Sequence, residues 1–185
     1  MQKTVQKTTF LLFIVLHFSF LGGVLVDNEG NPWIWLILLI IASLLLFFYL
    51  KEENQFERIL RKRDSLSIAM AVLGAYFTYF LNHTYDLGVV LSAGITGLAG
   101  SFIPLFNSKS ELLKVVPTAM YCGAFAGMTA PHIASDYSFI LYAGFLTGIL
   151  LVFARDFLNG HGGKLGTIAF GGVSIVYFVI YLAEL

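Results

Sequence analysis

The chain has few charged residues and a single cysteine. Charged side chains make up 12% of its 185 residues, about half the share in an ordinary soluble domain, whereas 58% of the residues are hydrophobic. The 11 Lys and Arg balance the 11 Asp and Glu, which excludes a basic nucleic-acid-binding protein. One cysteine, Cys122, excludes a disulfide framework and a cysteine-based metal site. We therefore expect an all-helical integral membrane protein that contacts the lipid bilayer and no nucleic acid.

Seven apolar stretches are each close to the length of a membrane-spanning helix. A helix that rises about 1.5 Å per residue needs about 20 apolar residues to cross a hydrocarbon core about 30 Å thick. None of them alternates apolar and polar residues, as the strands of an outer-membrane barrel do. The expected spans are roughly 8–26, 33–50, 65–82, 87–106, 113–130, 137–154 and 165–182.

The positions of the basic residues predict the orientation in the membrane. Every Lys and Arg falls before the first span or in the segments after the second, fourth and sixth spans. Because basic segments remain in the cytoplasm, we expect a cytoplasmic N-terminus and an extracytoplasmic C-terminus. The expected location is the plasma membrane, which in bacteria is the inner membrane. A cleaved signal peptide is the alternative for the first span, although no small-x-small cleavage site follows it.

Glycine is concentrated in the later part of the chain, with 15 of the 18 glycines from Gly74 onward. Small residues at four-residue spacing let helices approach closely in lipid, where no hydrophobic force drives them together. We therefore expect a single membrane domain, residues 1–185. Its parts are a peripheral helical hairpin (1–50), a charged cytoplasmic linker with an interfacial helix (51–64), and a Gly-rich core of five helices (65–185).

An internal repeat is suggested by two segments, about 66–106 and 116–154, which match at a separation of about fifty residues. The alignment needs slips of one residue, so chance similarity between Gly- and Ala-rich helices is the alternative. A true duplication predicts two parallel helical hairpins around an axis along the membrane normal. Transporters built from repeats place their pathway at the interface between the copies.

Four polar residues are predicted at the outer ends of the core helices: His83, Asp86, His132 and Asp136. Imidazole and carboxylate groups bind metals and exchange protons, and His83 and His132 are the candidate metal ligands. Short polar loops commonly contain the same residue types, and Asp136 could equally cap the sixth span.

A second set of candidates is predicted at the inner end: Arg155, Asp156, His161 and Lys164. The glycines among them allow a ligand to approach the backbone, and the first amides of the seventh span could hold an anion. The segment matches neither a Walker motif nor a dinucleotide fingerprint. A flexible turn with cations at the membrane surface, or a local ion pair between Arg155 and Asp156, would explain the same residues.

Ionisable residues are almost absent from the spans themselves. His17 is the exception, and a lone histidine in this setting typically makes a hydrogen bond between helices. The absence of a charge at the membrane midplane disfavours a proton-coupled pump. Pro104, Pro117 and Pro131 lie near the ends of spans four and five, where they mark either broken helices or ordinary helix ends. Residues expected to line a pathway or to pack helices together are Gly94, Thr96, Gly97, Ser101, Gly123, Gly127, Thr147 and Gly148.

These features favour a small permease or channel that moves a small solute or ion through a pathway among the third to seventh helices. The alternative is a non-transporting membrane subunit or scaffold that assembles with a partner membrane protein, and the Gly-rich faces are also compatible with a homo-oligomer. The sequence contains neither an HExxH motif nor a serine nucleophile elbow. We therefore expect neither an enzyme nor a cofactor.

Overall fold

The computed structural model describes residues 2–28, 30–51, 62–134, 136–155 and 163–183, and over these ranges the protein is all-helical, without strands. This confirms the predicted helical class, and seven α-helices are described where the sequence predicts seven spans. The interfacial helix expected within 51–64 falls largely on residues 52–61, outside the described ranges. In chain order the helices are α1 (Gln2–Asp27), α2 (Pro32–Lys51), α3 (Lys62–Tyr85), α4 (Val89–Phe102), α5 (Val116–Gly127), α6 (Tyr137–Phe153) and α7 (Lys164–Ala183), with 3₁₀ turns η1 (Ile103–Asn107) and η2 (Leu113–Val115) between α4 and α5.

Four of the described helices are long and apolar enough to cross a membrane. They occupy Lys7–Asp27, Arg63–Tyr85, Val89–Asn107 and Lys164–Ala183. Two further apolar helices, Pro32–Phe47 and Tyr137–Phe153, are shorter. By length and composition, these helices are compatible with a membrane protein.

Helix α5 is shorter than the span expected at 113–130. It has 12 residues, and a helix of that length rises about 18 Å, less than the thickness of a hydrocarbon core. Pro117 lies in its first turn, and Pro131 follows its C-terminal end, where a proline disfavours helical geometry in the residue before it. Pro104 likewise lies in the first turn of η1. All three prolines therefore mark ordinary helix ends.

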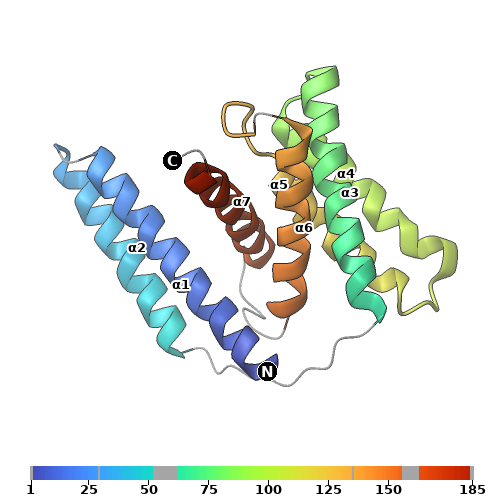
Figure 1. Ribbon diagram of the computed structural model, residues 1–185, viewed down its shortest axis with the longest axis horizontal. Coiled ribbons are helices and arrows are strands. Elements are labelled where there is room, and N and C mark those ends of the chain that lie inside the picture. Colours follow the sequence, from blue (N-terminus) through green and yellow to red (C-terminus); the bar gives the residue numbers. More distant parts are fainter. Residues whose placement is uncertain (1, 29, 52–61, 135, 156–162, 184–185) are drawn as a thin grey trace.

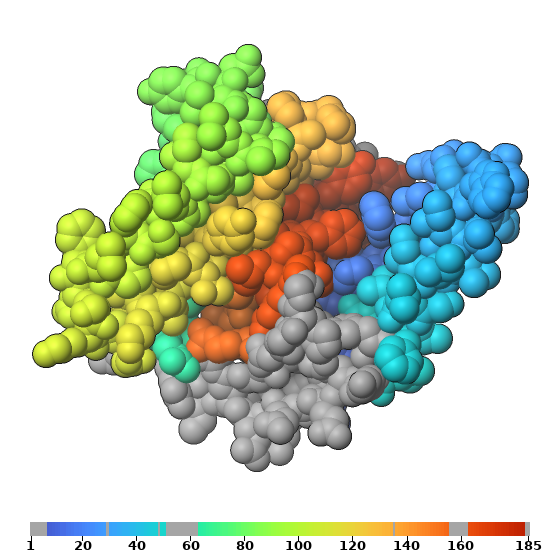
Figure 2. Space-filling view, turned by 180° about the vertical axis from the view of Figure 1, so that it is seen from behind, coloured from blue at the N-terminus to red at the C-terminus, as the bar shows by residue number. Residues whose placement is uncertain are grey.

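Helices α3 and α5 pack against each other more extensively than any other pair, and α6 lies beside α3 in Figure 1. Helix α4 packs against α5, α6 packs against α3, and α7 contacts both α5 and α6. The α1–α2 pair lies to one side and reaches this group through contacts of α1 with α6 and α7 (Figures 1 and 2). Only 11% of the apolar window of α1 is buried, compared with 39% for α3, so α1 presents far more apolar surface to its surroundings.

Glycines allow α3 and α5 to touch through their backbones. A Cβ added to Gly74 would overlap the carbonyl group of Met120, and a Cβ added to Gly123 would overlap that of Ala71. Gly123 follows Gly74 by 49 positions, and Met120 follows Ala71 by the same number. The two helices therefore make the same backbone contact twice, in reciprocal directions.

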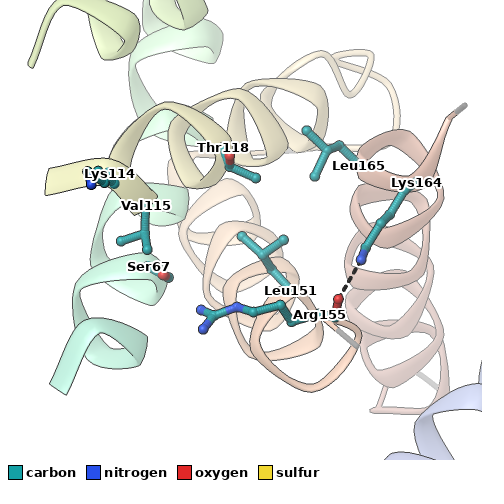
Figure 3. Close-up of a pocket in the computed structure, with 8 residues that line it drawn as sticks. All are labelled: Ser67, Lys114, Val115, Thr118, Leu151, Arg155, Lys164 and Leu165. Carbon is teal, nitrogen blue, oxygen red and sulfur yellow. Dashed lines mark hydrogen bonds between the residues drawn. The ribbon is translucent and has the colours of Figure 1, made fainter. Parts of the chain in front are cut away.

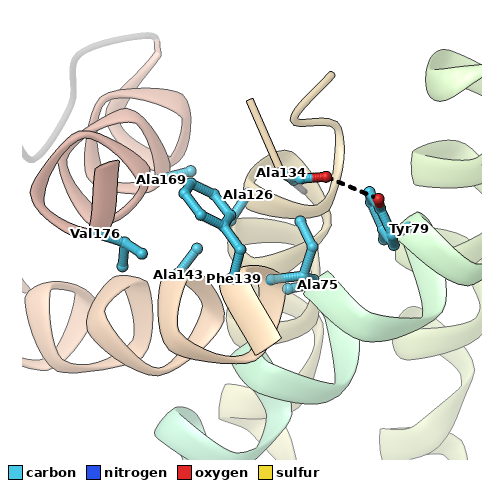
Figure 4. Close-up of a cluster of buried hydrophobic side chains, with 9 residues drawn as sticks. Ala75, Tyr79, Ala126, Ala134, Phe139, Ala143, Ala169 and Val176 are labelled. Carbon is cyan, nitrogen blue, oxygen red and sulfur yellow. Dashed lines mark hydrogen bonds between the residues drawn. The ribbon is translucent and has the colours of Figure 1, made fainter. Parts of the chain in front are cut away.

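Two clusters of buried side chains complete the packing. One, shown in Figure 4, gathers small residues of α3, α5, α6 and α7 around Phe139, and the hydroxyl of Tyr79 donates to the carbonyl of Ala134 at 3.1 Å. The other surrounds Phe13, which is fully buried and connects α1 to α6 and α7. Near it, the Tyr49 hydroxyl lies 3.0 Å from Nδ1 of His17, so the lone histidine forms a hydrogen bond between helices.

Candidate functional site

A cavity of about 380 Å³ lies where the first turns of α3, α5 and α7 meet the C-terminal end of α6 (Figure 3). We call it the basic pocket. It is at the end of the bundle that the positive residues predict to be cytoplasmic. Its walls combine three cationic side chains with hydroxyl and aliphatic groups: Ser67, Lys114, Val115, Thr118, Leu151, Arg155, Lys164 and Leu165.

Arg155 connects two helices at this pocket. Its Nη2 donates to Oδ1 of Asp64 at 3.0 Å, and the two side chains are 26% and 5% exposed. Asp64 lies in the first turn of α3, where the helix dipole stabilises a negative charge. The Nη1 atom of Arg155 is buried and has no hydrogen-bond partner among the described residues. One face of the guanidinium is thus held by the ion pair, and one donor group remains unused.

The other two cations are held by neighbouring groups. Lys164 donates from Nζ to the carbonyl oxygen of Arg155 at 2.8 Å, which joins the start of α7 to the end of α6. Lys114 forms an exposed ion pair with Glu111. The hydrogen bond from Lys114, followed by its charge, lowers the pKa of the Glu111 carboxyl. Charge therefore concentrates at the rim of the basic pocket.

The structure brings together two of the four inner candidates. Arg155 and Lys164 both line the basic pocket, whereas Asp156 and His161 lie outside the described residues. Sequence reasoning missed the role of Asp64, which was assigned to the charged linker, because α3 begins earlier than the apolar stretch does. An acidic residue just before an apolar run is a typical helix-start signal and could have indicated this position.

The outer candidates have separate structural roles. Asp136 is the N-cap of α6, and its Oδ1 accepts a hydrogen bond from the backbone N–H of Phe139 at 2.9 Å, which confirms the capping interpretation. The ring of His83 stacks on Tyr79 with centroids 5.5 Å apart. Asp86 is in a turn with φ of 51°, and His132 is exposed in the turn after α5.

A metal centre at the outer end gains no support from this arrangement. Among the residues that the structure describes, no three His, Cys, Asp or Glu side chains are grouped so that they could hold a metal ion. His83 and His132 are both described, and neither belongs to such a group.

The pathway candidates divide into packing residues and polar residues. Gly97 lies against the ring of Tyr121, Gly148 against the backbone of Ile68, and Gly123 and Gly127 against the backbone of α3. Gly94 is exposed, with open space around it. Gly97, Gly123, Gly127 and Gly148 thus serve close helix packing.

Over the described ranges, several buried hydroxyl groups have no hydrogen-bond partner: those of Thr78, Ser92, Thr96 and Thr147. The hydroxyl of Thr147 faces α7 so closely that a Cβ added to Gly172 would overlap it. Ser101 differs, because its hydroxyl donates to the carbonyl of Leu98 at 2.6 Å. A helical Ser or Thr hydroxyl commonly donates a hydrogen bond to the backbone carbonyl one turn earlier. The four unpartnered hydroxyls are therefore able to form a hydrogen bond with another polar group inside the bundle.

The fold and the pocket define an all-helical protein with four helices of membrane-crossing length and a cation-lined cavity at one end of its core. Comparisons of this chain with protein-family models, with curated proteins and with solved structures give no match.

Proposed function

We propose that this chain is a small multi-pass membrane permease that moves a small solute or ion through a pathway among helices α3–α7. The observation that carries the proposal is the basic pocket, where four of these helices converge. Thr147 lies one helical turn from Leu151, which lines the pocket. The hydroxyl of Thr147 would therefore continue the polar lining of the pocket into the bundle. The pocket would be the inner entrance of the pathway.

The unpartnered hydroxyls support this interpretation energetically. Burying a hydroxyl without a hydrogen bond costs about 1–3 kcal/mol, so such groups are normally paired with protein or water. In a pathway, these groups would form hydrogen bonds with a solute that has lost its hydration shell. Thr147, between α6 and α7, is the best placed of them because it is nearest to the pocket.

The reciprocal contact between α3 and α5 supports a duplicated architecture. We propose that α3–α4 and α5–α6 are parallel copies, related by a two-fold axis that passes between α3 and α5. Transporters with such repeats place their sites at the interface between the copies. Because the α3–α5 contact leaves no room for even a methyl group, a solute could pass here only if the helices moved. This favours an alternating-access carrier over a permanently open channel.

Uptake into liposomes tests the proposal. Purified protein would be reconstituted alone and assayed with radiolabelled phosphate, sulfate, acetate and rubidium. We expect uptake of at least one probe, slowed in Thr147→Val without loss of the folded state. Thr129→Val is the matched control, because its hydroxyl is occupied by the carbonyl of Ala126 at the end of α5. No uptake of any probe, together with a stoichiometric partner that co-purifies from native membranes, would instead identify a membrane subunit.

The proposed orientation has a test of its own. A reporter fused after Leu185 should be extracytoplasmic, and one inserted near Arg61 should be cytoplasmic. Both reporters in one compartment would contradict an odd number of spans between them and the assignment of the basic pocket to the cytoplasmic side.

A further inference from the structure

The basic pocket lies at the level where a candidate membrane span begins. Two of the membrane-length helices start beside it: Arg63–Tyr85 begins one turn before Ser67, and Lys164–Ala183 begins at Lys164 itself. Ser67, Lys164 and Leu165 therefore lie within the first two turns of these spans. In a bilayer, this is the depth of the lipid headgroups rather than of the hydrocarbon core.

The polar side of the pocket suits a phosphate group. Lys114, Arg155 and Lys164 contribute three cationic side chains from three different parts of the chain (Figure 3). Within the part of the chain that the structure describes, Nη1 of Arg155 is buried without a hydrogen-bond partner, whereas Nη2 is fixed by Asp64. A guanidinium that lines the pocket and is held in one orientation is well prepared to bind a phosphate oxygen.

The remaining wall of the pocket is apolar. Val115, Leu151 and Leu165 present aliphatic side chains between the cationic groups. The cavity volume of about 380 Å³ falls within the range of small-molecule sites and exceeds what one phosphate ion needs. A ligand with a phosphate group joined to an apolar part would contact both kinds of wall.

We infer that the basic pocket binds the phosphate group of an anionic ligand, with the adjoining aliphatic wall covering an apolar part of the same molecule. A membrane phospholipid and a soluble phosphate share this chemistry. Basic pockets between helices at the cytoplasmic surface are a recurrent means of binding anionic headgroups. The inference concerns binding alone and does not depend on whether the protein transports a solute.

Lipid retention in detergent provides the test. Purified protein would be incubated with mixed micelles that contain either phosphatidylglycerol or phosphatidylcholine, and bound lipid would be counted by native mass spectrometry. A separate titration would use inorganic phosphate and follow thermal unfolding. We expect wild-type protein to retain phosphatidylglycerol in preference to phosphatidylcholine. Stabilisation by inorganic phosphate without lipid retention would support the same phosphate site with a soluble ligand as its occupant.

Two variants and one control locate the site. Lys114→Gln should weaken binding about fivefold, because the attraction between one cation and an anionic lipid surface raises the binding affinity by about that factor. Arg155→Gln, combined with Asp64→Asn so that no charge is left unpaired, should weaken it at least as much. Lys109→Gln is the control, because Lys109 is an exposed cation between η1 and η2 that does not line the pocket. Equal binding by all these proteins, or an equal loss in Lys109→Gln, would overturn the inference.

Discussion

The guanidinium of Arg155 and the carboxylate of Asp64 form an ion pair between residues 91 positions apart, with nitrogen and oxygen separated by 3.0 Å. The pair joins the C-terminal end of α6 to the first turn of α3. Asp64 is almost fully buried and Arg155 is mostly buried. The attraction between the two charges therefore offsets part of the free-energy cost of removing them from water. The same contact holds Arg155 in the wall of the basic pocket.

Asp64→Ala should destabilise the protein by about 3 kcal/mol, because it leaves the guanidinium of Arg155 without its partner in a largely buried site. Thermal unfolding in detergent measures the change.

The double variant Asp64→Ala/Arg155→Ala should lose less stability than the sum of the two single variants, since the first substitution already removes the interaction. Strict additivity would show that the pair contributes nothing. Glu111→Ala, which removes one side of the exposed pair with Lys114, should have a much smaller effect.

Gly123→Ala should destabilise the core by about 1–3 kcal/mol, because the added methyl group forces the backbones of α3 and α5 apart. Gly94→Ala is the matched control, since Gly94 also lies within a helix but has open space around it. There the gain in helix propensity should leave stability unchanged or raise it by up to about 1 kcal/mol. Thermal unfolding of both variants provides the comparison. Equal losses at the two sites would contradict the close α3–α5 contact.

Tyr79→Phe should cost about 1–2 kcal/mol, because it leaves the buried carbonyl of Ala134 without its hydroxyl donor. That hydrogen bond fixes the turn before α6 to α3 and supports the buried cluster in Figure 4. Tyr142→Phe removes a hydroxyl from an exposed side chain and should be nearly neutral. The thermal unfolding midpoints of the two variants should therefore separate clearly.

Lys114→Gln should raise the pKa of Glu111 toward its ordinary value, because the ammonium group that favours the carboxylate is removed. Any stability gained from this pair is present above the ordinary pKa of a glutamate. It is lost as the pH falls through the lowered pKa in the folded protein. An NMR titration of side-chain-labelled glutamate measures the change. The control Lys109→Gln should leave the Glu111 titration unaltered.

Local features of the helix ends could be predicted more reliably than the residues of the site. The capping role of Asp136 follows from its place directly before an apolar run, and the structure confirms it. The length of α5 was predicted wrongly, because hydrophobicity continues to Ala130 whereas the helix ends at Gly127 before Pro131. Ser67 and Lys114 could not be recognised as pocket residues, because a hydroxyl or a cation near a helix start has no distinctive pattern.

The sequence by itself determined the helical class and the approximate positions of the helices. Runs of apolar residues broken by short polar segments are local properties, so they can be recognised along the chain without knowledge of its tertiary contacts. The tertiary structure alone decided that Lys114, Arg155 and Lys164 line one pocket, that Asp64 pairs with Arg155, and that α3 and α5 make their backbone contact twice. These relationships join residues far apart in the chain, and they depend on which helix faces pack together. The faces that pack together are determined by the shapes of all the packed side chains, since the side chains of two helices in contact interlock along the whole contact.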